Sequence, residues 1–138
     1  MKTLYLIAGA ALVLAGAALA QTGKPASAGI YSKGQAARGA ALYEQTCTRC
    51  HGSALEGADV IPPLSGGRFI GAWVGQPVSA LTTRIRTSMP ADMPGQLGLA
   101  ATADITAYIF QANGYPAGDA EMPAGNAGLQ ALTIDAPK

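Results

Sequence analysis

Both cysteines of this 138-residue chain and its only histidine lie within five consecutive positions. The segment reads Cys47-Thr48-Arg49-Cys50-His51. Cysteines three apart on a helical turn project to one side, and the next residue can turn its imidazole toward the same region. A disulfide that closes only two intervening residues would add little stability by the loop-entropy account. The pair therefore indicates chemistry rather than a structural cross-link.

C-x-x-C-H is the attachment signature of haem c, in which both sulfurs form thioethers with one porphyrin and the histidine binds its iron. A thioredoxin-like pair needs a βαβ setting, which this sequence does not show. A zinc site needs about four ligands, and the chain offers two Cys and one His. A core histidine beside two incidental cysteines is the remaining alternative. We expect Cys47 and Cys50 to attach one haem c and His51 to be an axial ligand.

The N-terminus has the pattern of a secretory signal peptide. Lys2 precedes an uncharged apolar stretch over residues 4–19, which closes on Ala18-Leu19-Ala20. We expect cleavage after residue 20 and a periplasmic protein; an uncleaved membrane anchor is the alternative. The remaining chain carries 8 basic residues, one fewer than the full chain, against 8 acidic ones. This neutral balance argues against a nucleic-acid partner, and membrane association is not expected after cleavage.

The expected mature chain is short of large apolar side chains, since much of its apolar content is alanine. A small domain of this kind needs something else to complete its core, and a porphyrin would serve. The bulky residues are four tyrosines together with Trp73, Phe69 and Phe110.

Apolar periodicity predicts an all-α chain without strands. Residues 34–46, 69–74, 77–88 and 102–112 are the expected helices, the last capped by Thr102 and stopped by Asn113-Gly114. Residues 52–68 and 89–98 are expected loops. Residues 21–33 form a flexible lead-in, 34–115 the domain, and 116–138 a C-terminal tail packed on or beside it. Gly39 interrupts the first helix, where glycine is disfavoured by about 1 kcal/mol, which indicates a close backbone crossing.

Over residues 34–115 the sequence resembles the class I cytochrome c family. In that family a glycine eight residues before the first cysteine, and an aromatic four later, pack against the C-terminal helix. Gly39, Tyr43 and the Ile105/Tyr108 pair match these positions. The resemblance implies three to five short helices wrapped around one covalently attached haem. It also implies that Pro62, followed by Leu64 at the haem edge, accepts a hydrogen bond from the imidazole through its carbonyl.

The resemblance also bears on the sixth iron ligand, for which spacing alone leaves Met89 and Met93 open. The run Arg84–Ser88 directly before Met89 is similar to small c-type cytochromes associated with pyrroloquinoline-quinone dehydrogenases. In that group the methionine after this run is the ligand. The resemblance therefore implies Met89, with Met93 as the alternative.

Other residues are expected near the cofactor on weaker grounds. Most surface arginines are simply solvated, but two roles are possible here: pairing with haem propionates, and forming a docking rim for an acidic partner. The candidates are Arg49, Arg68, Arg84 and Arg86, of which Arg84 is the better candidate for a propionate. The Trp73 N–H could also reach a propionate.

The sequence predicts a one-electron carrier rather than an enzyme, because two axial ligands would leave no iron position for a substrate. Its expected partners are redox proteins, with a quinoprotein dehydrogenase as donor and a terminal oxidase or another cytochrome as acceptor. Two alternatives remain. The first is a haem enzyme or gas sensor with an open iron position. The second is a dedicated cytochrome subunit of a dehydrogenase complex.

Overall fold

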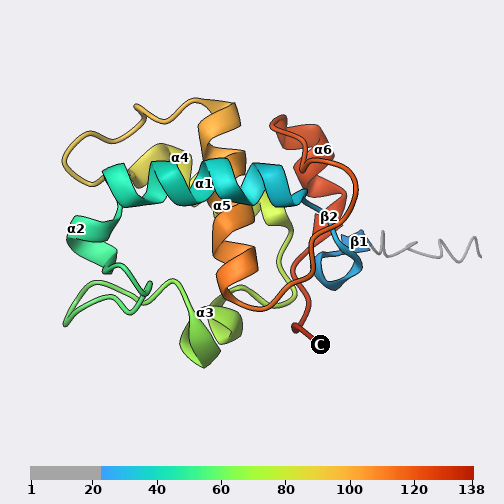
Figure 1. Cartoon of the computed structure of the whole chain (residues 1–138), viewed down its shortest axis with the longest axis horizontal. Coiled ribbons are helices and arrows are strands. Elements are labelled where there is room, and N and C mark those ends of the chain that lie inside the picture. The colour runs from blue at the N-terminus through green and yellow to red at the C-terminus, as the bar shows by residue number, and fades with distance from the viewer. Residues whose placement is uncertain (1–22) are drawn as a thin grey trace, which may run out of the picture.

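The computed structural model describes residues 23–138, so the expected signal peptide lies outside the described residues. Two 14-residue helices, α1 (Lys33–Thr46) and α5 (Leu99–Ala112), cross at the centre of the molecule (Figure 1). They make the most extensive contact between helices in this part of the chain. Ser32 caps α1, since its Oγ accepts a hydrogen bond from the Gln35 N–H at 3.0 Å.

The crossing depends on Gly39, as the sequence predicts. A Cβ built on Gly39 would overlap the Asp104 carbonyl group of α5 and would lie 3.0 Å from the Tyr108 Cβ. One turn later Tyr43 packs on Tyr108 with ring centroids 5.2 Å apart. Ile105 is buried at the same interface. The disfavoured mid-helix glycine is therefore required by the approach of two backbones.

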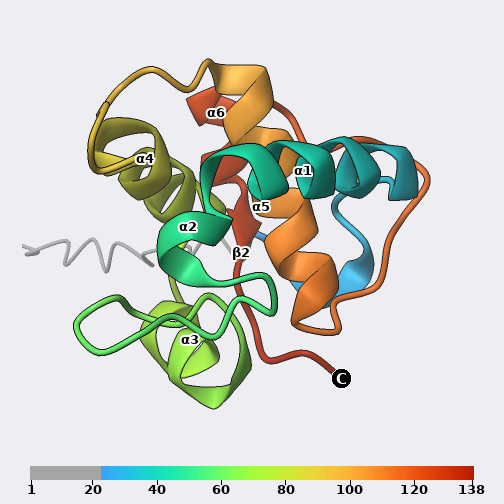
Figure 2. The ribbon, with the colours of Figure 1, turned by 60° about the vertical axis from the view of Figure 1, so that its left-hand side comes forward.

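The other elements are arranged around this pair (Figures 1 and 2). Helices α2 and α4 lie toward one end of the molecule, α3 lies below α5 in the view of Figure 1, and α6 and the two strands lie toward the other end. Buried Val78, Leu81 and Ile85 form the apolar stripe expected on α4. The elements are α2 (Thr48–His51), α3 (Gly66–Trp73), α4 (Val78–Ser88), α6 (Asn126–Gln130), β1 (Lys24–Pro25), β2 (Leu132–Thr133) and a 3₁₀ turn (Ala26–Ala28).

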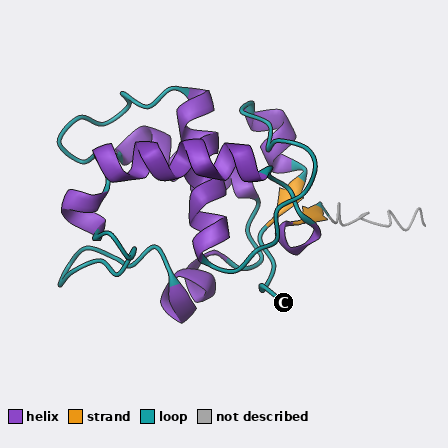
Figure 3. Ribbon diagram, in the orientation of Figure 1, coloured by secondary structure: helices purple, strands orange, loops and turns teal. Residues whose placement is uncertain are grey.

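The expectation of no strands is wrong at the chain ends. β1 and β2 pair in parallel, with Lys24 opposite Leu132 (Figure 3). Ser27 donates hydrogen bonds to the Asp135 carboxylate from both its N–H and its hydroxyl. Tyr31, which is buried, donates to the Tyr115 carbonyl at 2.6 Å. Residues 23–33 are therefore packed against the C-terminal segment, unlike the flexible lead-in that their Gly, Ser and Pro content predicts.

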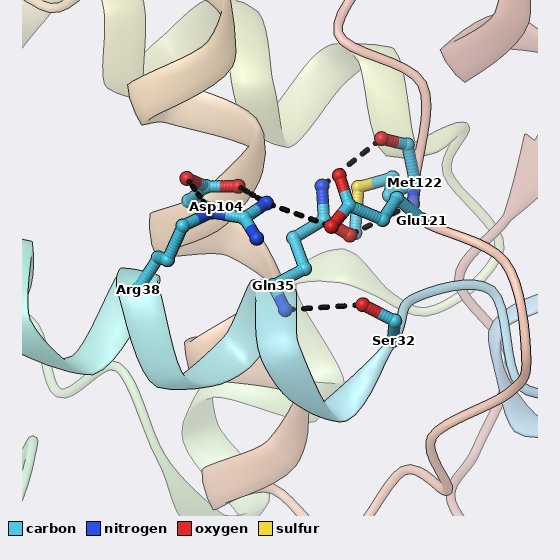
Figure 4. A network of polar contacts seen from close by, with 6 residues as sticks. All are labelled: Ser32, Gln35, Arg38, Asp104, Glu121 and Met122. Atoms are coloured by element: carbon cyan, nitrogen blue, oxygen red, sulfur yellow. Dashed lines mark hydrogen bonds and ion pairs between the residues drawn. The ribbon is translucent and has the colours of Figure 1, made fainter.

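The tail after α5 is part of the core. Leu129, Leu132 and Ile134 are all buried, as is Met122. Gln35 of α1 exchanges two hydrogen bonds with the Met122 backbone, at 3.0 and 2.7 Å (Figure 4). Burial removes the Gln35 amide and the Met122 backbone from water, and these two bonds replace the hydrogen bonds to water that are lost.

A second set of polar contacts, made by Arg38, joins α1 to α5 and to the C-terminal tail. Arg38 donates to both carboxylate oxygens of Asp104, each at 3.0 Å, and to Glu121 at 2.9 Å (Figure 4). The bidentate pair lies one residue from Gly39, so it joins α1 to α5 beside their crossing. The hydrogen bonds that Arg38 donates to Asp104 and Glu121 raise its pKa, so the guanidinium keeps its charge.

The all-α expectation is confirmed, with differences at the ends of the helices. α5 begins at Leu99, three residues before Thr102, and Gly98 is its N-cap. The Thr102 hydroxyl does not cap the helix; it donates back to the Gly98 carbonyl at 3.0 Å. α3 starts at Gly66 within the expected loop, and α6 was not expected. Within residues 23–138 no helix is long and apolar enough to cross a membrane.

Replacing Gly39 by alanine should lower the free energy of unfolding by about 2–3 kcal/mol, because the new methyl overlaps the α5 backbone. Gly34→Ala in the same helix is the control. A Cβ there meets only the Ser32 Oγ at 3.8 Å, so this variant should be neutral or more stable by about 0.5–1 kcal/mol. Chemical denaturation measures both, and equal effects would contradict the assigned crossing.

Candidate cofactor site

The C-x-x-C-H segment forms α2, a single turn that continues directly from α1. Cys47 is the N-cap and His51 the last residue. The His51 N–H donates to the Cys47 carbonyl at 2.9 Å, which closes the turn. Gly52 ends it with φ +77°, a conformation that favours glycine. Neither cysteine is in a disulfide; Cys47 is half-buried and Cys50 exposed.

The His51 side chain is held by the segment that the sequence analysis identified. The imidazole is buried, and its Nδ1 lies 3.0 Å from the Pro62 carbonyl oxygen. A carbonyl can only accept, so this contact assigns the proton to Nδ1 and leaves the lone pair on Nε2. The contact expected between Pro62 and His51 is present. Nε2 of His51 is therefore the nitrogen that can bind a metal ion.

The 52–65 loop that carries Pro62 is tied back to the motif. The Gly57 N–H donates to the His51 carbonyl at 2.8 Å, and the Leu64 N–H donates to the Leu55 carbonyl at 2.8 Å. Gly57 has φ +67°, and a Cβ there would lie 2.8 Å from the Pro62 carbonyl carbon. Local sequence gives no signal for this approach, because the turn is defined only once the loop folds back.

Several apolar side chains pack on the core but stay partly exposed. They come from α1, the 52–65 loop, α3, the end of α4 and the 89–98 loop, and most of these elements lie at the α2 end of the molecule (Figures 1 and 2). A planar apolar cofactor against them would remove their remaining apolar surface from water. These residues are Leu42, Leu64, Ile70, Trp73, Met89 and Leu97.

The two candidate methionines differ in their environment. Met89 is the C-cap of α4, its N–H donates to the Ile85 carbonyl at 2.9 Å, and its side chain packs on the core. Met93 is 49% exposed. A thioether ligand has to be held by its surroundings, so the packing favours Met89 over Met93.

The four arginines that the sequence analysis singled out fall into two groups. Arg49, in the motif, forms an ion pair with Asp92 of the 89–98 loop. This hydrogen bond holds the pKa of Asp92 below its ordinary value, although such an exposed pair contributes little stability. Arg68, Arg84 and Arg86 are exposed, so the structure places Arg84 at the surface. A haem-pocket role for Arg84 or Trp73 stays a prediction.

The donor set fits a thioether-linked haem better than a dithiol or a metal site. Burial raises the pKa of the Cys47 thiol, while a hydrogen bond from Thr46 opposes this. Within residues 23–138, no three His, Cys, Asp or Glu side chains converge as ligands of one ion. Two free sulfurs beside an oriented imidazole match haem c.

An all-α fold around crossed helices, with a C-x-x-C-H turn and a proline carbonyl on its histidine, defines a class I c-type cytochrome. Residues 34–109, more than half of the chain, match the family model described as cytochrome c oxidase, cbb3-type, subunit III. The chain belongs to this family. The family implies covalently bound haem c and indicates electron transfer as the activity.

A solved structure has a similar fold. A chain in the sulfane dehydrogenase SoxCD from Paracoccus pantotrophus is 27% identical, with a TM-score of 0.55. The alignment covers 82% of this chain and 61% of that one, so this protein corresponds to less than two thirds of its length. A comparison with curated protein sequences finds no match.

Sequence reasoning missed some residues that organise the site. Gly57 and the Arg49–Asp92 pair carried no recognisable local signal. Asn113 was interpreted only as part of a helix stop, but its side chain bonds to the loop beyond Pro62. The sequence offered one hint of a further role for Asn113: Gly114 alone can end the helix, so the amide before it is not needed for that purpose.

Proposed function

We propose that this chain is an exported monohaem cytochrome that carries one electron at a time, with His51 and Met89 as axial ligands. The observation that carries the proposal is the oriented imidazole of His51. Its Nδ1 is bonded to the Pro62 carbonyl at 3.0 Å, so Nε2 is the nitrogen left to bind iron. Bonding at Nδ1 also raises the basicity of the ligand.

Met89 as the second ligand is supported by its packing at the end of α4 and by its half-buried side chain. The Arg49–Asp92 ion pair supports it further, since it joins the motif to the loop that follows Met89. With a histidine and a thioether bound, the iron has no free position for a substrate, and the thioether favours the reduced state.

Haem iron supplies the one-electron couple, and the chain controls where that couple is placed. The partly exposed apolar side chains on the core would pack against the haem and exclude water, while the Pro62 carbonyl keeps the ring of His51 in one orientation. The described residues need to move no proton in this activity. In this proposal the role of the protein is therefore to hold His51 and Met89 in fixed positions around the iron, in surroundings of low polarity.

A redox protein is the proposed partner. Residues 60–91 contain three arginines and no acidic residue or lysine, and all three arginines are exposed. Such a stretch favours an acidic partner surface, met in a brief encounter over a small interface. A quinoprotein dehydrogenase as donor, and an oxidase or second cytochrome as acceptor, fit this chemistry.

A second candidate is a fixed subunit of a redox enzyme complex. It is favoured by the similarity to a chain found in the SoxCD sulfane dehydrogenase. Co-purification at constant stoichiometry through size exclusion would support the subunit, and recovery of the free chain would support the mobile carrier.

Export and covalent attachment can be tested together. Intact mass of the periplasmic protein should correspond to residues 21–138 plus one haem, because the Ala18-Leu19-Ala20 site is cleaved and both thioethers form on one porphyrin. The variant with both Cys47→Ser and Cys50→Ser should carry no covalent haem, whereas Thr48→Ser should match the wild type. Covalent haem in the double variant would contradict the attachment site.

The sixth ligand can be tested by optical spectroscopy of the oxidised protein. Met89→Ala should abolish the near-infrared sulfur-to-iron band, because it removes the bound thioether. Met93→Ala should retain the band, since this side chain is half exposed and unbound. The reverse pattern would assign the ligand to Met93, and a wild type without the band would contradict methionine ligation.

A further inference from the structure

Asn113, the C-cap of α5, joins the end of this helix to the segment that leads into α3. Its Nδ2 donates to the Leu64 carbonyl at 2.9 Å and to the Ile109 carbonyl at 2.8 Å. Its Oδ1 accepts from the Gly66 N–H at 3.0 Å. Within residues 23–138, no other hydrogen bond joins α5 or its cap to the 52–66 segment.

The need to end α5 does not explain why position 113 is an asparagine. Asn113 has φ −95°, which any residue can adopt, and Gly114 takes the left-handed position with φ +81°. The glycine therefore ends α5 whatever the side chain before it. What requires an amide is the pair of partners in the 64–66 segment, since the Leu64 carbonyl needs a donor and the Gly66 N–H needs an acceptor. Aspartate has the same shape but lacks both donors.

The contact of Asn113 reaches the proximal side of the site through the Leu64 backbone. The Leu64 N–H is held by the Leu55 carbonyl at 2.8 Å, and its carbonyl is held by Asn113. Pro62, two residues earlier, presents its carbonyl to His51 Nδ1. The Asn113 amide therefore ties the segment that carries this carbonyl to the end of α5.

We propose that Asn113 is a positioning residue for His51. Its amide anchors the 62–66 segment to α5 and so keeps the Pro62 carbonyl on the imidazole Nδ1–H. The proposal rests on the proposed role of His51 as the proximal haem ligand. It assigns to Asn113 an effect on the ligand, distinct from a general contribution to stability.

The test is hydrogen exchange of the His51 Nδ1 proton, followed by NMR in the reduced, haem-loaded protein labelled with ¹⁵N. Asn113→Ala and Asn113→Asp should each accelerate this exchange by about tenfold, because each removes both donated hydrogen bonds. Gln35→Ala is the matched control. It also removes an amide with two backbone hydrogen bonds, but these hold Met122 against the first turn of α1, at the opposite end of this helix from the motif (Figure 4). Exchange at His51 should stay at the wild-type rate in this variant.

Two outcomes would overturn the proposal. Unchanged exchange in Asn113→Ala, with His51 still bound to iron, would remove the positioning role alone. Equal acceleration in Gln35→Ala would show that exchange follows overall stability. A wild-type protein whose His51 is not bound to iron would instead contradict the proposed function, and the inference on Asn113 with it.

Discussion

The close crossing of α1 and α5 at Gly39 is the contact on which the rest of the structure depends. Without a side chain at this position, the α1 backbone lies against the Asp104 carbonyl group. One turn later Tyr43 packs on Tyr108, which fixes how far α1 extends beyond the crossing. Because α2 continues from α1, the crossing also determines where Cys47 and the rest of the motif lie.

Two hydrogen bonds connect this helix pair to the residues around His51. The Tyr43 hydroxyl donates to the Gly52 carbonyl at 2.7 Å, directly after His51. From the other helix, Asn113 holds the Leu64 carbonyl. The histidine and the loop that supplies its hydrogen-bond acceptor are thus both anchored to the same pair of helices, α1 and α5. An electron carrier benefits from such rigidity, because little has to move when the charge on the iron changes.

The parts that could be predicted from sequence are those with a local signature. The motif spans five residues, and Gly39 stood out because a helix disfavours it. The terminal strands could not be predicted, since they are two residues long and join segments about 108 positions apart. Thr102 was misplaced because a threonine hydroxyl can cap a helix or donate back within it, and sequence does not separate these. The role of Asn113 depends on backbone groups brought near it only by folding.

The proposed function requires both axial positions of the iron to be filled by the chain. Packing of Met89 and orientation of His51 support this, whereas an enzyme or gas sensor would need one position open. The most direct measurement is the visible absorption spectrum of the reduced protein before and after exposure to carbon monoxide. The account predicts an unchanged spectrum at neutral pH. Rapid formation of a carbon monoxide complex would contradict it.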